Sequence, residues 1–453
     1  MARLRTVYVC TDCGHEHPKW TGQCAGCGAW NSLVEDVVGD APVVTAAARR
    51  PGAAVRAVAP VALDGTAAPG THTTATGIGE LDRVLGGGLV PGSVTLLGGE
   101  PGIGKSTLLS QVVGSWSGRS LYVSAEESTE QVRLRAARLG VKSDAALLVS
   151  LYTVNDIIAA IDAATPDLVI IDSIQTISDP TLGSAPGSVV QVRECAHRLV
   201  QEAKTRGIAV VLVGHVTKEG SIAGPRLLEH VVDTVLSFEG DRVHALRSVR
   251  AMKHRFGSTN ELGLFEMTAD GLRDVPDAST LFLADRQRGV PGSVVVPVLD
   301  GHRPLLVEMQ ALTTKTTSGV PPRRSSQGLE SSRLAMLLAV LDRRAGCSLA
   351  AHEVFVSVVG GIRVSDPGAD LGMCIALASS LRDVAVDPTI TCIGEVGLAG
   401  EVRHVAQIER RLSEASRLGF TTAIIPASAS VRAPKGMCLV RVASIGDAIK
   451  HAM

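Results

Sequence analysis

The stretch from residue 99 to residue 106 has the residue types and spacing that bind a nucleoside triphosphate. It reads Gly-Glu-Pro-Gly-Ile-Gly-Lys-Ser and fits the pattern G-x-x-x-x-G-K-[ST] at every fixed position. The glycines let backbone N–H groups turn towards a phosphate, and Lys105 and Ser106 supply a point charge and a Mg²⁺ ligand. A chance glycine-rich turn before a helix is the alternative. We predict that ATP and Mg²⁺ bind at Gly99, Glu100, Pro101, Gly102, Ile103, Gly104, Lys105, Ser106 and Thr107.

Two carboxylates that follow apolar runs complete the predicted catalytic set with Lys105. The run 168–171 leads into Asp172, which we expect to hold Mg²⁺ together with Ser106, although an Asp here could also be a helix N-cap. The run 120–124 leads into Glu126, the predicted base that orients the attacking water, with Glu127 as the second choice. Solvated carboxylates in the first turn of a helix are the alternative for both glutamates.

Four cysteines near the start of the chain have the spacing of a zinc site. Cys10-x-x-Cys13 and Cys24-x-x-Cys27 supply four thiolates, enough for a tetrahedral Zn²⁺ shell, and a redox C-x-x-C pair is the alternative. A segment this short cannot fold on its own core, so the metal must stabilise it. His15 and His17 are expected at the surface, because the cysteines already fill the shell.

A basic run lies later in the chain, at Arg247, Arg250, Lys253, His254 and Arg255, and ends at Phe256 and Gly257. No acidic residue interrupts residues 243–259. In a chain whose net charge is −1, such a cluster is a candidate for contacts with a nucleic-acid backbone. A solvated, charged strand edge is the alternative.

The elements that must position these residues follow from the apolar pattern. Apolar residues make up 45% of the 453 residues, and short apolar runs alternate with amphipathic stretches between residues 71 and 275. We expect strands at 93–97, 120–124, 168–171, 208–213 and 234–238, and helices at 105–116, 129–139 and 189–205. The predicted domains are a zinc finger at 1–33, a flexible linker at 34–70, an ATPase domain at 71–275 and a further domain at 276–453.

The order of these motifs resembles the RecA-like ATPases. The segment from His215 to Gly220, His-Val-Thr-Lys-Glu-Gly, looks like that of the bacterial RadA (Sms) family of recombination and repair proteins, and the resemblance covers essentially the whole chain. It implies an α/β fold: a RecA-like P-loop ATPase core with an N-terminal zinc knuckle and a C-terminal Lon-protease-like α+β domain. His215 and Lys218 would link the state of ATP to DNA. The family's Lys-Asn-Arg-Phe-Gly motif corresponds to residues 253–257, where His254 replaces Asn.

The C-terminal domain, clearest from residue 351, resembles the proteolytic domain of Lon. The position of the serine nucleophile is Gly368, and no lysine lies between Lys315 and Lys435, so a Ser–Lys dyad is impossible. We interpret the domain as a scaffold for ring assembly, with Arg403, His404, Arg410 and Arg411 as candidates to face DNA.

The resemblance implies a DNA-dependent ATPase in homologous recombination and repair, helicase-like in branch migration. Expected partners are single-stranded and branched DNA, the strand-exchange recombinase and further copies of the chain in a hexameric ring. A Lon-type protease and a nucleotide switch that binds only proteins are the alternatives. Apolar runs such as 208–213 are far shorter than the roughly 20 residues that span a bilayer, so we expect a cytoplasmic protein without membrane contact.

Overall fold

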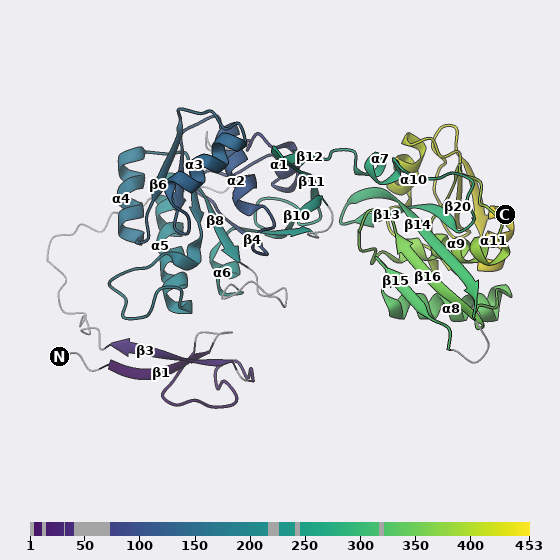
Figure 1. Cartoon of the computed structure of the whole chain (residues 1–453), viewed down its shortest axis with the longest axis horizontal. Coiled ribbons are helices and arrows are strands. Elements are labelled where there is room, and N and C mark those ends of the chain that lie inside the picture. The colour runs from purple at the N-terminus through teal and green to yellow at the C-terminus, as the bar shows by residue number, and fades with distance from the viewer. Residues whose placement is uncertain are drawn as a thin grey trace, which may run out of the picture. The chain divides into compact units, whose positions relative to one another are not determined.

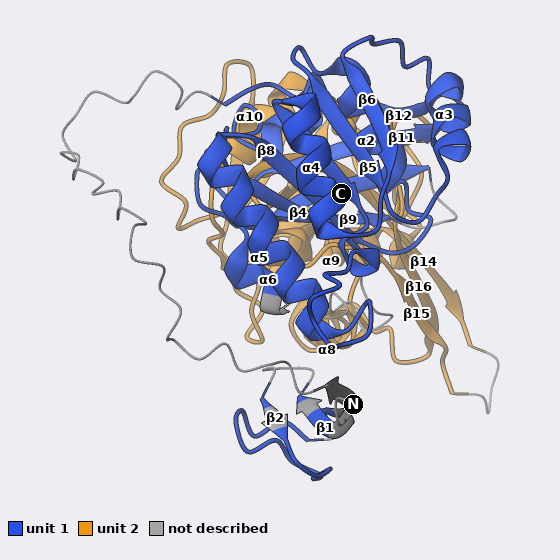
Figure 2. Ribbon diagram, turned by 90° about the vertical axis from the view of Figure 1, so that its left-hand side faces the viewer, with its two compact units in different colours: residues 1–274 blue, residues 275–453 orange. Residues whose placement is uncertain are grey.

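The computed structural model of the chain divides into two compact units, Met1–Asp274 and Val275–Met453 (Figures 1 and 2). It describes residues 4–10, 15–30, 32–39, 73–215, 226–240, 245–316 and 321–453. The boundary between the units falls one residue before the expected boundary at 275/276. Lys218 and Cys13 lie outside the described residues.

A small sheet carries the cysteines in unit 1. It has three strands in the order β2-β1-β3: β1 (Leu4–Cys10), β2 (Glu16–His17) and β3 (Leu33–Gly39). We expected a linker from residue 34, but this was wrong for residues 34–39. β3 pairs with β1 from Leu33 through to Gly39, since its valines favour an extended, paired backbone. The remainder of the expected linker, 40–70, lies outside the described residues.

The ATPase domain is built on a sheet of nine strands, in the order β12-β11-β10-β9-β4-β8-β7-β5-β6. The strands are β4 (Val94–Gly99), β5 (Ser120–Ser124), β6 (Ala146–Ser150), β7 (Leu168–Asp172), β8 (Ala209–His215), β9 (Thr234–Gly240), β10 (Leu246–His254), β11 (Leu262–Thr268) and β12 (Gly271–Asp274). From β9 to β6 all neighbours are parallel, whereas β10, β11 and β12 are antiparallel. The basic run therefore lies mainly on an interior strand, and not on a sheet edge.

Helices cover both faces of this sheet. They are α1 (Gly79–Val84), α2 (Lys105–Ser115), α3 (Thr129–Arg138), α4 (Val154–Ala164), α5 (Val189–Arg206) and α6 (Arg226–Val231), with the short helix η1 (Ile174–Thr176). One apolar core includes residues of α1, α2 and α3, and a second core on the other face includes residues of α4, α5 and α6. The central strands are buried on both faces, which explains why they appear in the sequence as continuous apolar runs.

Unit 2 has a sheet of seven strands in the order β15-β16-β14-β13-β17-β20-β21, and the short pair β18-β19. Its strands are β13 (Ser293–Asp300), β14 (Arg303–Lys315), β15 (Arg324–Gln327), β16 (His352–Val358), β17 (Ile390–Cys392), β18 (Glu395–Val396), β19 (Val402–Arg403), β20 (Thr422–Pro426) and β21 (Cys438–Val442). Its helices are α7 (Ala278–Leu283), α8 (Ser331–Ala345), η2 (Pro367–Ala369), α9 (Asp370–Arg382), α10 (Ile408–Arg417) and α11 (Ile445–Ala452). This mixture of antiparallel and parallel strands with helices agrees with the expected α+β character.

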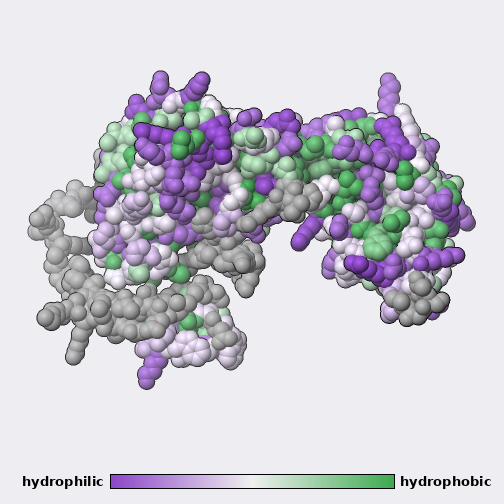
Figure 3. Space-filling view, viewed as in Figure 1, coloured by the Kyte–Doolittle hydropathy of each residue, from purple (hydrophilic) through white to green (hydrophobic). Residues whose placement is uncertain are grey.

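In the view of Figure 3, hydrophilic side chains cover much of the visible face of both units, with smaller apolar areas among them. Among the described residues, no helix combines the length and the apolar composition that a membrane crossing requires.

Candidate functional site

The glycine-rich loop connects β4 to α2, as its sequence context predicts. Gly102 and Gly104 have φ angles of +78° and +117°, which L side chains rarely adopt. A Cβ at Gly104 would also lie 2.6 Å from Cε of Met267 in β11. The glycines therefore allow both the backbone turn and the close packing of the loop against the sheet.

Lys105 begins α2 and is only 5% exposed. Its Nζ donates to the carbonyl oxygens of Gly99, at 2.7 Å, and Glu100, at 2.9 Å. Burial lowers the pKa of Lys105, whereas the negative charges of Asp172, Glu126 and Glu100 raise it. The predicted catalytic residues Lys105, Asp172 and Glu126 are thus close enough to interact electrostatically, although they come from three different segments of the chain.

Asp172, at the end of β7, is 7% exposed and is held by a tyrosine that the sequence analysis missed. Tyr122 in β5 donates its hydroxyl hydrogen to Oδ2 of Asp172 at 2.5 Å. Burial, followed by the charge of Asp172, raises the pKa of Tyr122 well above its ordinary value. The tyrosine therefore remains a neutral donor and fixes one carboxylate oxygen. The strand order β7-β5 brings the two together across 50 residues, and no local pattern indicates it.

The two adjacent glutamates take different partners. Oε1 of Glu126 accepts a hydrogen bond from the hydroxyl of Ser173, the residue after Asp172. Glu127 instead forms an ion pair with Arg135 of α3, with 2.5 Å between its Oε2 and Nη1 of the arginine. The parallel register pairs Ser124 with Asp172, so that the chain after β5 emerges beside the end of β7. Of the two candidates, only Glu126 bonds to a residue next to Asp172.

His215 ends β8, where the register pairs it with Gly99, the first glycine of the loop. The segment that follows β8 therefore begins beside the nucleotide loop. The side chain of His215, like the whole of Lys218, is outside what the structure describes.

The basic residues at the end of β10 bond to the chain's own groups around α6. Nζ of Lys253 donates to the carbonyl oxygens of Glu229, at 2.5 Å, and Val232, at 2.8 Å, and so caps the C-terminal end of α6. Burial, followed by the charge of Arg255, lowers the pKa of Lys253. Arg255, whose side chain is 48% exposed, forms an ion pair of 2.9 Å with the buried Asp233. Lys253 and Arg255 thus fasten the segment immediately after α6.

His254 joins two more segments to this end of β10. Its Nε2 lies 3.2 Å from the carbonyl oxygen of Leu85, and its Nδ1 lies 3.1 Å from the hydroxyl of Thr234. Because a carbonyl only accepts, Nε2 carries the hydrogen. A Cβ at Gly257 would lie 2.9 Å from this ring, and Phe256 packs edge-on to it with ring centres 6.3 Å apart. The residue that departs from the family motif therefore has a defined structural role.

The cysteines of the small sheet form a cluster. The sulfur atoms of Cys10, Cys24 and Cys27 lie within 4.8 Å of one another. Zinc–sulfur bonds of about 2.3 Å require thiolates at about this separation, so the described donors fit Zn²⁺, with Cys13 as the expected fourth. Hydroxyl and amide groups also surround the sulfurs: Ser32 Oγ is 3.2 Å from Cys10, and the Gly26 amide is 3.3 Å from Cys24.

The expectation that His17 lies at the surface was wrong. His17 is only 7% exposed, and its Nε2 lies 3.4 Å from Sγ of Cys24. With zinc bound, the thiolate of Cys24 would accept a hydrogen bond, and Nε2–H of His17 would be its donor. His15, in contrast, is exposed as expected. Pairing of β1 with β2 positions His17, since its register partner is Tyr8 near the end of β1.

In unit 2, a buried arginine packs against Gly368, the position that the resemblance to Lon gives to the nucleophile. Arg411 of α10 is 2% exposed, and its guanidinium donates to Asp366 and to the carbonyl oxygens of Pro297 and Ala406. A Cβ at Gly368 would lie 2.7 Å from Nη1 of Arg411. The expectation that Arg411 could face DNA was therefore wrong, because a bidentate ion pair holds it in the interior. Arg403 and Arg410 are exposed.

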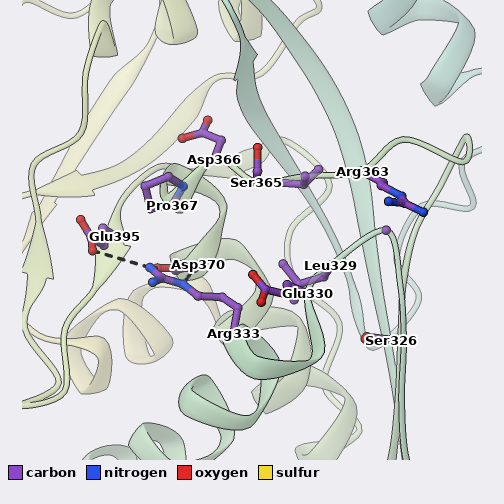
Figure 4. Close-up of a pocket in the computed structure, with 12 residues that line it drawn as sticks. Ser326, Leu329, Glu330, Arg333, Arg363, Ser365, Asp366, Pro367, Asp370 and Glu395 are labelled. Carbon is purple, nitrogen blue, oxygen red and sulfur yellow. Dashed lines mark hydrogen bonds and ion pairs between the residues drawn. The ribbon is translucent and has the colours of Figure 1, made fainter. Parts of the chain in front are cut away.

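A cavity of about 600 Å³ lies beside this position (Figure 4). In the close-up, Arg333 points towards Asp370 and Glu395. Arg333 Nε donates to Oδ1 of Asp370 at 2.9 Å, and Nη2 lies 3.6 Å from Glu395. Burial raises the pKa of Asp370, although the bonds from Arg333 act against this. The lining contains Ser365 but no lysine, so the cavity cannot form a Ser–Lys dyad.

Comparisons with known proteins agree with this three-part organisation. Family models match an AAA domain at residues 74–221, a rubredoxin metal-binding domain at 8–35, and the C-terminal proteolytic domain of Lon protease (S16) at 346–436. A KaiC-like protein from Pyrococcus horikoshii, known from a crystal structure, aligns with a TM-score of 0.38 and 20% identity, over 46% of this chain and 100% of its own.

Two curated relatives match over the whole length. A protein of Bacillus subtilis described as DNA repair protein RadA is 46% identical over 460 residues, which cover 100% of both chains. The protein of the same description from Pseudomonas aeruginosa is 48% identical over 99% of each chain. The chain therefore belongs to the RadA family of DNA repair proteins, with a P-loop ATPase domain between a zinc-binding ribbon and a Lon-like domain.

Proposed function

We propose that the protein is an ATPase stimulated by DNA, which moves or reshapes single-stranded and branched DNA during recombination and repair. The observation that carries the proposal is that Lys105, Asp172 and Glu126 come together at one end of the parallel strands: Lys105 bonds to the carbonyl oxygen of Gly99, where β4 ends, and Glu126 accepts from Ser173, directly after Asp172. In sheets of this kind, ligands bind beyond the carboxyl ends of the strands.

Each residue has a distinct role in this proposal. The backbone N–H groups of the loop, which residues 99–107 other than Pro101 supply, and the ammonium of Lys105 bind the phosphates, and Lys105 exchanges its two carbonyl partners for phosphate oxygens. Ser106 and Asp172 hold Mg²⁺, which neutralises developing charge on the phosphates when bound. Glu126 orients the water, while Ser173 positions the carboxylate.

Coupling to DNA is assigned to the segment between β8 and α6. That segment begins at His215, which pairs with the first loop glycine, and it leads to α6, whose end Lys253 caps. Loss of the γ-phosphate would thus act where the segment begins, while Lys253 and Arg255 hold the far end of α6, the helix into which the segment leads. Contact with DNA through Lys218, the hexameric ring and the recombinase partner are proposed from the family resemblance.

The experiment is ATP turnover with and without single-stranded DNA, for the wild type, Lys105→Ala, Lys253→Ala and Lys142→Ala. Lys142 lies outside the proposed machinery and serves as the matched control. We expect near-zero turnover for Lys105→Ala. For Lys253→Ala we expect normal basal turnover but lost stimulation, because α6 is no longer capped. Unchanged turnover in Lys105→Ala would refute the ATPase assignment, and a wild type indifferent to DNA would refute the DNA dependence.

A further inference from the structure

Arg247 is the most deeply placed member of the basic run. It lies in β10, is 7% exposed, and donates from Nε to the carbonyl oxygen of Ile103 at 3.1 Å. Its Nη1 donates to the carbonyl oxygen of Leu246 at 2.9 Å. Ile103 is part of the nucleotide loop, 144 residues earlier in the chain. This arginine therefore contacts the loop that binds phosphate, and its burial leaves it no DNA-facing surface.

The hydrogen bond to the carbonyl of Ile103 also determines the direction of the next N–H group, that of Gly104. In a trans peptide the C=O and N–H groups of one unit point in opposite directions. If Arg247 holds the carbonyl of Ile103 towards β10, the N–H of Gly104 points the other way, into the loop. Inward N–H groups are what a P-loop offers to phosphate. A positive charge on the carbonyl also polarises the peptide unit and strengthens its N–H as a donor.

The surrounding residues leave room for this contact. Gly240 pairs with Arg247 across β9 and β10, and a Cβ at Gly240 would lie 2.5 Å from Cδ of Arg247. Gly104 similarly leaves space for Met267, as described above. Two glycines thus let the antiparallel part of the sheet support the loop from the side opposite to the phosphates.

We propose that Arg247 is a positioning residue for nucleotide binding, which orients the Ile103–Gly104 peptide unit so that its N–H faces the phosphates. The inference rests on the proposed nucleotide site. It assigns a role to the antiparallel extension of the sheet, because β10 supports the loop at Arg247 and holds the end of α6 at Lys253.

The test compares Arg247→Met, Arg247→Lys and Arg273→Gln in the full-length chain. Arg273→Gln removes the same charge from a side chain on β12 that is 71% exposed and pairs with Glu266. Titration with a fluorescent ADP analogue and Mg²⁺ gives the affinity, and Tm without nucleotide reports folding. Hydrogen exchange of the loop amides in the nucleotide-free protein reports their order directly.

We expect Arg247→Met to weaken ADP binding about tenfold, which corresponds to about 1.4 kcal/mol. Its nucleotide-free Tm should stay within a few degrees of the wild type, while the loop amides exchange faster. Arg247→Lys should recover part of the affinity, and Arg273→Gln should bind normally. Unchanged affinity in Arg247→Met, or a loss that only follows a lower Tm, overturns the inference. Failure of the wild type itself to bind ADP would instead overturn the proposed function.

Discussion

At the scale of single residues, two neighbouring carboxylates have different surroundings, although the sequence does not show which of them acts as the base. Glu126 accepts a hydrogen bond from Ser173 beside Asp172, and Glu127 forms an ion pair with Arg135. We expect Glu126→Gln to keep the shape and the nucleotide affinity of the site but to lose the base. General-base catalysis contributes about 10²–10⁴-fold, so steady-state ATP turnover should fall by about this factor while ADP affinity changes little.

Glu127→Gln is the matched control for that substitution. Glu127 pairs with Arg135 through a side chain that is 40% exposed, and exposed ion pairs contribute at most about 1 kcal/mol to the free energy of unfolding. We therefore expect nearly normal turnover and a small loss of stability at α3. If Glu127→Gln abolished turnover and Glu126→Gln did not, the two assignments would have to be exchanged.

At the scale of elements, continuous apolar runs predicted the five central strands of the parallel sheet, because burial on both faces leaves that pattern. Strand β6 escaped detection because it lies at the edge of the sheet and is only partly buried. The bonds Tyr122–Asp172 and Arg247–Ile103 could not be predicted at all. They depend on the lateral order of the strands, which joins residues 50 and 144 positions apart.

The small sheet that carries the cysteines gives another example of a contact that local sequence does not predict. The spacing of the cysteines predicts a metal site, but it does not indicate that His17 lies beside Cys24. Hydrogen bonds to metal ligands orient them, and their loss typically lowers metal affinity by about 10–100-fold. We expect His17→Asn to release Zn²⁺ to a competing chelator at correspondingly lower chelator concentrations. The exposed His404 provides the control, and His404→Asn should retain zinc as the wild type does. Equal zinc retention in both variants would exclude a role for His17.

At the scale of the whole molecule, three modules share one chain: a zinc-binding ribbon, a P-loop ATPase domain and a Lon-like domain. Unit 2 matches a proteolytic domain over residues 346–436, and Arg411 occupies the space beside Gly368, the position that the resemblance to Lon gives to the nucleophile. A serine at position 368 would have no room, since Arg411 is held by four described partner atoms and cannot move aside cheaply. The packing around Arg411 therefore leaves no space for a larger residue at position 368.

The buried ion pair between Arg411 and Asp366 leads to a prediction about the stability of unit 2. Arg411→Met removes one partner of a buried ion pair and leaves Asp366 uncompensated, which typically costs about 3–5 kcal/mol. All tryptophans lie in unit 1, at positions 20, 30 and 116, so fluorescence does not report on unit 2. Hydrogen exchange of the amides in α10 and β13 is the suitable measurement, and we expect their opening free energy to fall by that amount.

A second substitution distinguishes the contribution of the ion pair to stability from the contribution of side-chain packing. Asp366→Asn combined with Arg411→Met leaves no ionised carboxylate without a partner, and the single amide oxygen can still accept from one of the two N–H groups, of Gly368 and Leu299, that the carboxylate oxygens hold. The double variant should therefore be more stable than Arg411→Met alone. Arg410→Met, at the exposed neighbouring position, should exchange like the wild type. A double variant that is no more stable than Arg411→Met would show that Arg411 stabilises unit 2 by filling space, and that its charge contributes nothing.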